Sequence, residues 1–247
     1  MYRGRNNIFC PELLLNGMSE ITTILFDVGW PIIDETEAHE GWYAFIINTV
    51  KQKTGRAITR EDVLRTEADA VVCHAPSLFS YVIWQFTRPD EAAFYDIRRA
   101  FDEYYAGCRY RIQNGVREVL GRLYGRFKLG LAANQPTSVY NFLENNGILK
   151  FFDSTMVSDE IGFSKPDPRM FIKVLENLGA TPGETIMIGD RQDNDIAPAK
   201  LLGMKTIRLR IGPHKNQQIH YPSEKPDYEI DTIDQIIGIP EIKVRLS

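Results

Sequence analysis

The chain has 247 residues, of which 43% are hydrophobic and 25% charged, a composition typical of one large globular domain or a core with a smaller insert. Its formal net charge of −4 supplies no basic surface, so nucleic acid is not an expected partner. No run of residues approaches the roughly 18 apolar positions of a transmembrane helix, so no membrane association is expected.

Three widely spaced cysteines, Cys10, Cys73 and Cys108, form no zinc-binding pattern. Sparse, unpaired cysteines fit a reducing compartment, which predicts a cytoplasmic location. The apolar stretch near the N-terminus is short and is broken by Pro11, which is atypical of a signal peptide. We interpret residues 1–18 as an N-terminal extension that precedes the fold.

The first predicted strand is Thr22–Phe26, a short β-branched and apolar run. It ends at Asp27, and Gly29 follows two residues later. The C-terminal tips of strands are where an open α/β sheet carries its chemistry. Asp27 is therefore the candidate nucleophile.

Residues 35–112 are rich in helical patterns and in aromatic residues. The expected helices are residues 37–53, 60–72, 76–86 and 90–107. An all-helical segment inserted after the first strand predicts a cap domain over the C-terminal edge of a sheet.

From residue 115 onward, predicted strands and helices alternate. The later strands are Lys128–Ala132, Ser154–Val157, Thr185–Ile188, Thr206–Leu209 and Tyr228–Ile230. The helices are Gly115–Phe127, Ser138–Asn146, Pro168–Leu178, Asn194–Leu202 and a short Thr232–Ile237. This alternation predicts an α/β fold, with a Rossmann-like parallel-sheet core formed by residues 19–34 and 113–247.

Polar side chains follow the ends of four of these strands: Asp27, Asn134, Lys165 and Asp190, with Asp195 nearby. The carboxyl ends of parallel strands share one edge, so these groups are expected to converge there. Asp27 and Asp190 offer the hard oxygen ligands that suit Mg²⁺. Lys165 can neutralise a phosphoryl oxygen, and Asp195 can hold the lysine in place. A carboxylate nucleophile beside a metal and a lysine suits phosphoryl transfer.

The chain resembles the haloacid dehalogenase (HAD) superfamily, in the subgroup with a helical cap after the first core strand. The resemblance covers residues 20 to about 237 and is strongest in Ser158–Pro168 and in Met187–Asp195. It implies that Asp27 is the nucleophile and a metal ligand, and that Lys165 binds phosphate.

The same resemblance implies that Asp190 is the second metal ligand and that the backbone carbonyl of Gly29 completes the protein ligands of a Mg²⁺ ion. It also implies a small phosphorylated substrate in a cleft between cap and core.

Two positions depart from the family pattern. Gly29 stands where phosphatases of the family carry a second aspartate that protonates the leaving group, and Ala133 replaces a phosphate-binding hydroxyl residue. A missing general acid costs about 10²–10⁴ in rate. Asn134 can replace the hydroxyl as a phosphate donor, and Trp30 is placed to contact the substrate.

We interpret the chain as a Mg²⁺-dependent phosphatase, monomeric or homodimeric, that forms an aspartyl-phosphate. Because Gly29 cannot donate a proton, a preference for good leaving groups is expected. Two alternatives stay open: a metal-independent dehalogenase, which also lacks the second aspartate, and a binding or regulatory protein that keeps the fold without turnover.

Overall fold

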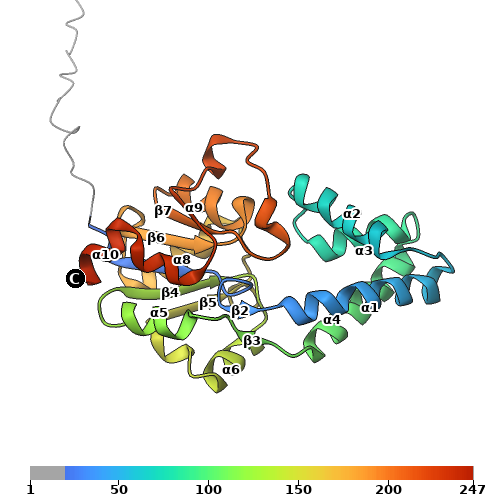
Figure 1. The fold of residues 1–247 in the computed structure, drawn as a ribbon, viewed down its shortest axis with the longest axis horizontal. Helices are drawn as coiled ribbons and strands as arrows, with labels where there is room; N and C mark the ends of the chain where they lie inside the picture. Colours follow the sequence, from blue (N-terminus) through green and yellow to red (C-terminus); the bar gives the residue numbers. More distant parts are fainter. Residues whose placement is uncertain (1–19, 247) are drawn as a thin grey trace, which may run out of the picture.

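The computed structural model describes residues 20–246 and contains a six-stranded parallel sheet in the order β5-β4-β1-β6-β7-β8 (Figure 1). The strands are β1 (Thr23–Phe26), β4 (Lys128–Ala133), β5 (Ser154–Val157), β6 (Thr185–Gly189), β7 (Lys205–Leu209) and β8 (Tyr228–Ile230). Almost every residue of β1, β4 and β6 is buried, as expected for parallel strands that are covered on both faces.

Helices cover both faces of this sheet. On one face, Ile24 and Phe26 of β1 share a core with α5 (Val116–Leu123), α6 (Ser138–Asn145) and α10 (Pro240–Leu246). On the other face, Leu25 packs with α8 (Pro168–Leu178) and α9 (Ala197–Leu201). This alternation of side chains along β1 places one strand at the centre of both cores.

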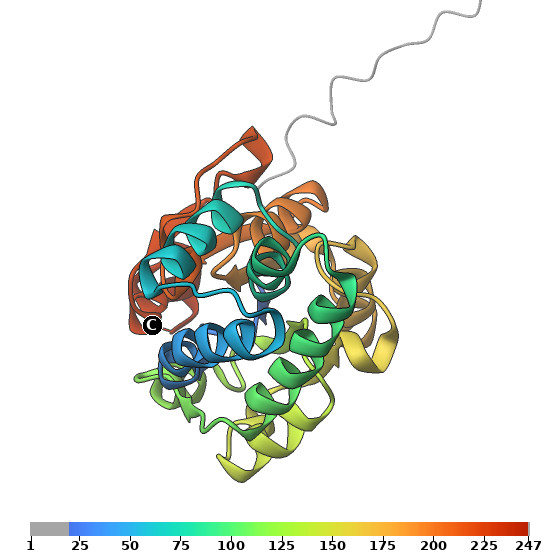
Figure 2. The same cartoon turned by 90° about the vertical axis from the view of Figure 1, so that its right-hand side faces the viewer.

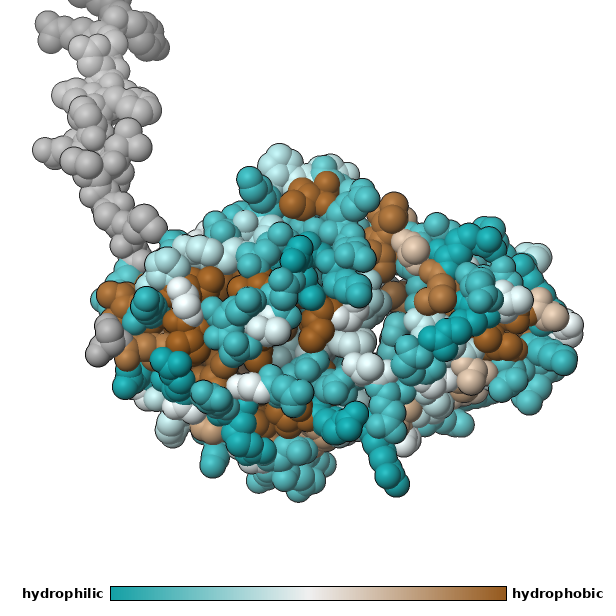
Figure 3. Space-filling model, in the orientation of Figure 1, coloured by the Kyte–Doolittle hydropathy of each residue, from teal (hydrophilic) through white to brown (hydrophobic). Residues whose placement is uncertain are grey.

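Four further helices form a separate lobe with its own apolar core around Trp42 and Phe101. They are α1 (Thr36–Thr54), α2 (Arg60–Val72), α3 (Leu78–Thr87) and α4 (Glu91–Gly107). Figures 1 and 2 show this lobe beside one edge of the sheet, and Figure 3 shows mainly hydrophilic side chains on the face of the lobe turned to the viewer.

A short antiparallel ribbon connects the lobe to the core. Strand β2 (Ile33–Asp34) leads into α1, and β3 (Arg111–Ile112) returns from α4. Both connections therefore pass through one pair of hydrogen-bonded strands, and the residue directly after β2 is Glu35.

The α/β fold predicted from the sequence is confirmed, and the expected strands and helices lie close to the observed ones. The expected helix Asn194–Leu202 is instead a π-helical turn, Gln192–Ile196, followed by the short α9. Thr232–Ile237 is a 3₁₀-helix at Ile233–Gly238. The sequence analysis did not identify β2, β3, α10 or the single-turn α7 (Ser158–Ile161), which are too short or too local to show a clear periodicity.

The proposed extension, residues 1–18, lies outside the described residues. Within residues 20–246, none of the helices is long and apolar enough to cross a bilayer.

Candidate active site

Asp27 directly follows β1, which lies between β4 and β6 in the sheet. Phe26 pairs with Leu131 of β4 on one side and with Ile188 of β6 on the other. The Asp27 N–H donates a 2.8 Å hydrogen bond to the Ile188 carbonyl, which fixes the backbone just past the strand end. The carboxylate therefore lies at the sheet edge reached by the loops after β4 and β6.

Lys165 lies between two carboxylates. Its ammonium is 2.6 Å from Asp27 Oδ1 and 2.6 Å from Asp195 Oδ1, and the side chain is buried. The backbone of the lysine is clasped by Asn134, whose Oδ1 accepts from the Lys165 N–H at 2.7 Å and whose Nδ2 donates to the Lys165 carbonyl at 2.8 Å. Asn134 thus anchors the lysine loop to the end of β4, a contact that the sequence analysis did not foresee.

Gly189 makes room for Asp195. A β-carbon at Gly189 would lie 2.3 Å from Asp195 Cγ, so a side chain there would displace the carboxylate. Asp195 Oδ2 accepts a 3.0 Å hydrogen bond from the Arg191 N–H, which leaves both oxygens of Asp195 engaged. Its position supports the expected role as the residue that holds Lys165.

The carboxylates of Asp27, Asp190 and Asp195 form a compact oxygen cluster. One oxygen from each lies within 4.8 Å of the others, and all three residues are buried. Lys165 and Arg191 occupy the oxygens of Asp195, whereas one oxygen of Asp27 receives no hydrogen bond from the described residues and Asp190 Oδ2 lies 3.6 Å from His214 Nδ1. Two convergent free carboxylates fit a small divalent cation such as Mg²⁺.

The electrostatics of the cluster also favour a cation. Burial, together with the neighbouring carboxylates, raises the pKa of Asp27 and the pKa of Asp190 to about 7. Burial disfavours the charged form of Lys165, but Asp195 and Asp27 outweigh burial and raise the lysine pKa. The buried site thus has more negative than positive charge, which a bound dication would balance.

The free energy of unfolding of the metal-free protein is expected to fall as the pH rises from about 5 to about 7.5 and to level off above that range. Burial raises the folded pKa of Asp27, Asp190 and Glu35 to about 7, above their ordinary values of 3.8 and 4.5. Between these values the folded state still holds protons that the unfolded state has lost, so stability falls until the folded state has released them. Burial lowers the pKa of His214 to about 3, so below about pH 6.5 this one group opposes the fall, which the three carboxyl groups outweigh. Chemical denaturation at several pH values measures the slope.

Mg²⁺ is expected to reverse this loss, with a larger stabilisation at the upper end of the pH range because it binds the ionised carboxylates. Asp190→Asn is the matched variant and should reduce both the pH slope and the Mg²⁺ effect. A wild-type protein whose stability rose with pH over this range would contradict the assigned charge balance.

A cavity of about 310 Å³ opens over the cluster and is bordered by both the sheet edge and the helical lobe. Its lining includes every candidate residue chosen from the sequence, Asp27, Gly29, Trp30, Asn134, Lys165, Asp190 and Asp195. It also includes residues that the sequence analysis did not select, namely Glu35, Gln135, Arg191, Asn194, Pro213, His214 and the segment from Pro76 to Phe79. Arg191 and Asn194 had a sequence signal, because both lie in the motif Met187–Asp195.

Trp30 borders the cavity in an unusual backbone conformation, with φ of 48°. Its ring packs against Gly212, where a β-carbon would lie 2.4 Å from Trp30 Cδ2. The ring also meets His39 of α1 edge-on at 5.9 Å. Trp30 therefore lies between the core and the helical lobe, where it can contact a bound molecule.

Glu35 is a buried carboxylate in the same cavity. Burial raises its pKa to about 7, and the hydrogen bond from the Tyr105 hydroxyl only partly opposes this effect. Among the described residues, no lysine or arginine forms an ion pair with Glu35.

Arg191 connects the core to the helical lobe. Asp193 accepts from the guanidinium at 2.5 Å, and Nη2 donates to the carbonyl of Ala75 at 3.1 Å. The residue after Asp190 thus ties the loop after β6 to the segment that precedes α3.

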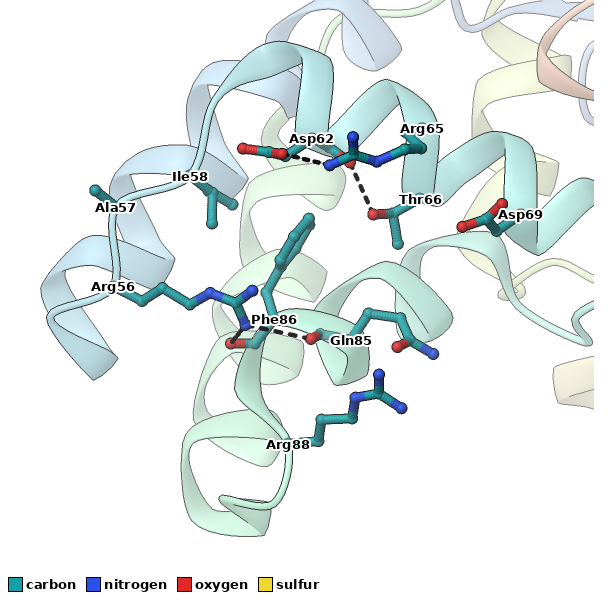
Figure 4. A pocket seen from close by; sticks show the side chains of 10 residues that line it. All are labelled: Arg56, Ala57, Ile58, Asp62, Arg65, Thr66, Asp69, Gln85, Phe86 and Arg88. Carbon is teal, nitrogen blue, oxygen red and sulfur yellow. Dashed lines mark hydrogen bonds and ion pairs between the residues drawn. The ribbon is translucent and has the colours of Figure 1, made fainter.

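A second pocket of about 240 Å³ lies within the helical lobe (Figure 4). It is at the end of α3 opposite the cavity described above, and Arg56, Arg65 and Arg88 border it. Arg56 donates to the Phe86 and Gln85 carbonyls and Arg65 pairs with Asp62, so two of the three cations are already engaged.

Parts of the sequence are similar to the sequences of known phosphatases. Over 120 residues the chain is 35% identical to a glyceraldehyde 3-phosphate phosphatase of Methanopyrus kandleri, covering 49% of this chain and 50% of the relative. Over 160 residues it is 30% identical to a phosphoglycolate phosphatase of Salmonella typhi, covering 62% of each protein. The matches thus span about half to just under two thirds of these relatives.

The fold matches that of a HAD phosphatase from Thermococcus onnurineus with a TM-score of 0.60 and 21% identity, over 89% of this chain and 97% of the other. The model of the family described as haloacid dehalogenase-like hydrolase matches residues 24–209, which is more than half of the sequence. The chain belongs to the haloacid dehalogenase-like hydrolase family.

Proposed function

We propose that the protein is a Mg²⁺-dependent phosphatase that hydrolyses a small phosphorylated metabolite through an aspartyl-phosphate on Asp27. The observation that carries this proposal is the buried cluster in which the Lys165 ammonium lies 2.6 Å from Asp27 while Asp190 converges on the same point. A nucleophilic carboxylate, a fixed cation and a second acidic ligand are the groups that phosphoryl transfer requires.

The proposed metal ligands are Asp27, Asp190 and the backbone carbonyl of Gly29. When bound, Mg²⁺ supplies charge neutralisation for the phosphoryl oxygens. Asp195 does not coordinate the ion in this scheme, because its oxygens are held by Lys165 and Arg191.

In the proposed reaction, an oxygen of the Asp27 carboxylate attacks phosphorus. A bond forms between this oxygen and phosphorus as the bond from phosphorus to the leaving oxygen breaks. Lys165 stabilises the charge on the phosphoryl oxygens and holds Asp27 in position. Water then attacks the aspartyl-phosphate at phosphorus, which releases inorganic phosphate and restores the Asp27 carboxylate.

Substrate contacts are proposed for Lys165, Asn134 and Trp30. The side-chain amide of Asn134 is used to hold the Lys165 backbone, so its main effect on phosphate is through the position of the lysine. The Gln135 amide lies beside Gly29 and is an additional donor that faces the cavity. Gln135 therefore takes over part of the role left open by Ala133.

We further propose that residues 35–112 act as a cap over the site and that the substrate is small. The cavity of about 310 Å³ suits a metabolite rather than a macromolecule. Both relatives are named as phosphatases of small phosphorylated compounds, which supports the same substrate class. A cytoplasmic location fits such a substrate.

Phosphate release from a panel of small phosphate monoesters, with Mg²⁺ and with EDTA, tests the proposed function. We expect release that requires Mg²⁺, because Asp190 converges with Asp27 in a cation-binding arrangement that carbon–halogen cleavage does not need. Halide release from 2-haloacids is measured in parallel. Halide release that EDTA leaves intact would overturn the proposal in favour of a dehalogenase.

The binding-protein alternative is tested on the same samples by calorimetry with Mg²⁺ and inorganic phosphate. Retained binding of both ions with no release of phosphate or halide from any compound would favour a protein that keeps the site without turnover.

A further inference from the structure

We propose that Glu35 is the general acid and base of the reaction and takes the place of the aspartate that position 29 lacks. The inference rests on the proposed phosphatase function and adds a catalytic residue to it. Glu35 comes from the connection to the helical lobe rather than from the loop after β1.

The position of the carboxylate is the first support. A β-carbon built on Gly29 would lie 3.3 Å from Glu35 Oε1 and 3.7 Å from Asp27 Oδ2. The Glu35 oxygen and the nucleophile oxygen thus flank the point from which a side chain at position 29 would extend. The Glu35 carboxylate thus lies where the side chain of a residue at position 29 would otherwise extend.

The orientation of the side chain is the second support. The Tyr105 hydroxyl of α4 donates to Glu35 Oε2, so this oxygen is anchored in the helical lobe. Oε1, in contrast, receives no hydrogen bond from the described residues and faces the side of the cavity where Gly29 and Gln135 lie. One oxygen is held and the other is free to exchange a proton with a substrate.

The absence of an ordinary structural role is the third support. Glu35 is at the N-cap position of α1, but its side chain makes no capping hydrogen bond to the helix. It is buried, and among the residues that the structure describes no cation pairs with it. A buried carboxylate without a counter-charge is costly, which a role in catalysis explains.

The proton transfers balance over the two steps. As the bond between phosphorus and the leaving oxygen breaks, protonated Glu35 transfers its proton to that oxygen. The resulting carboxylate then accepts a proton from the water that attacks the aspartyl-phosphate, which restores the protonated acid. The wild-type protein is accordingly expected to hydrolyse alkyl phosphates, whose leaving groups need a proton.

The experiment compares kcat/KM of the wild-type protein and of Glu35→Gln on 4-nitrophenyl phosphate and on ethyl phosphate. Because kcat/KM reports the steps up to leaving-group release, a missing acid affects only the poor leaving group. We expect Glu35→Gln to stay within about threefold of wild type on the aryl ester and to lose about 10²-fold or more on the alkyl ester. Glu35→Gln should also release a burst of nitrophenol, because dephosphorylation of Asp27 becomes slow.

Three variants sharpen the assignment. Glu67→Gln is the matched control, since Glu67 is also buried and accepts a hydrogen bond from a tyrosine, but it lies outside the cavity. Tyr105→Phe removes the anchor of Oε2 and should show a smaller loss that is again selective for the alkyl ester. Gly29→Asp combined with Glu35→Ala moves an acid into the vacated space and should recover alkyl turnover.

Equal losses of kcat/KM on both esters in Glu35→Gln, or no loss on either, would overturn the role of Glu35 while leaving the phosphatase function standing. A wild-type protein that hydrolysed 4-nitrophenyl phosphate but not ethyl phosphate would also overturn it. A wild-type protein without phosphatase activity on any ester would instead overturn the proposed function itself.

Discussion

Asp27→Asn is expected to abolish phosphate release, with a loss of at least about 10³-fold in kcat/KM. The amide cannot form the aspartyl-phosphate, and it also removes one of the two carboxylates with an oxygen free for the metal. The fold should persist, because asparagine has the same shape and relieves a buried negative charge. Steady-state kinetics with Mg²⁺ and a thermal melt measure the two effects.

Asp102→Asn is the matched control for this substitution. Asp102 is exposed on α4, where among the described residues it pairs only with Arg98, one turn earlier on the same helix. Turnover in this variant should equal that of wild type. Asp27→Asn that retained more than a tenth of wild-type turnover would exclude Asp27 as the nucleophile.

Lys165→Met is expected to lower kcat/KM by about 10³-fold, equivalent to roughly 4 kcal/mol of transition-state stabilisation. The ammonium is the only lysine or arginine group within ion-pair distance of Asp27 among the described residues. Methionine keeps much of the apolar stem but leaves Asp27 and Asp195 without their shared cation. The two carboxylates should then separate or take up a proton, which displaces the nucleophile.

Lys128→Met is the comparison for the second variant. Lys128 begins β4 at the opposite edge of the sheet, where its ammonium donates to the Leu178 and Gly179 carbonyls. It should leave kcat/KM unchanged. Lys165→Met that kept turnover within tenfold of wild type would show that another group binds the phosphate.

The central carboxylate cluster could be predicted from the sequence because it follows from a simple topological rule. Asp27 and Asp190 each come directly after a strand, and adjacent parallel strands deliver such residues to the same edge. The same rule placed Asn134 near the site. Lys165 required the additional resemblance of its motif, because a loop and the single turn of α7 separate it from β5.

The contacts that these residues make in the folded protein could not be predicted in the same way. Asn134 holds the lysine backbone with both ends of its amide, which depends on the conformation of two loops that are 31 residues apart. Gly189 excludes a side chain because the Asp195 carboxylate occupies that space, which only the π-helical turn after β6 brings about.

The sequence by itself determined the α/β class and the identity of the acids and the lysine at the strand ends. These follow from local hydrophobic patterns and from residue types at strand ends, which act over a few residues. The tertiary structure decided what stands beside Gly29. Glu35 reaches that point because β2 and β3 pair and Tyr105 of α4 holds its carboxylate, and contacts between segments so far apart in the chain leave no periodic trace in the sequence.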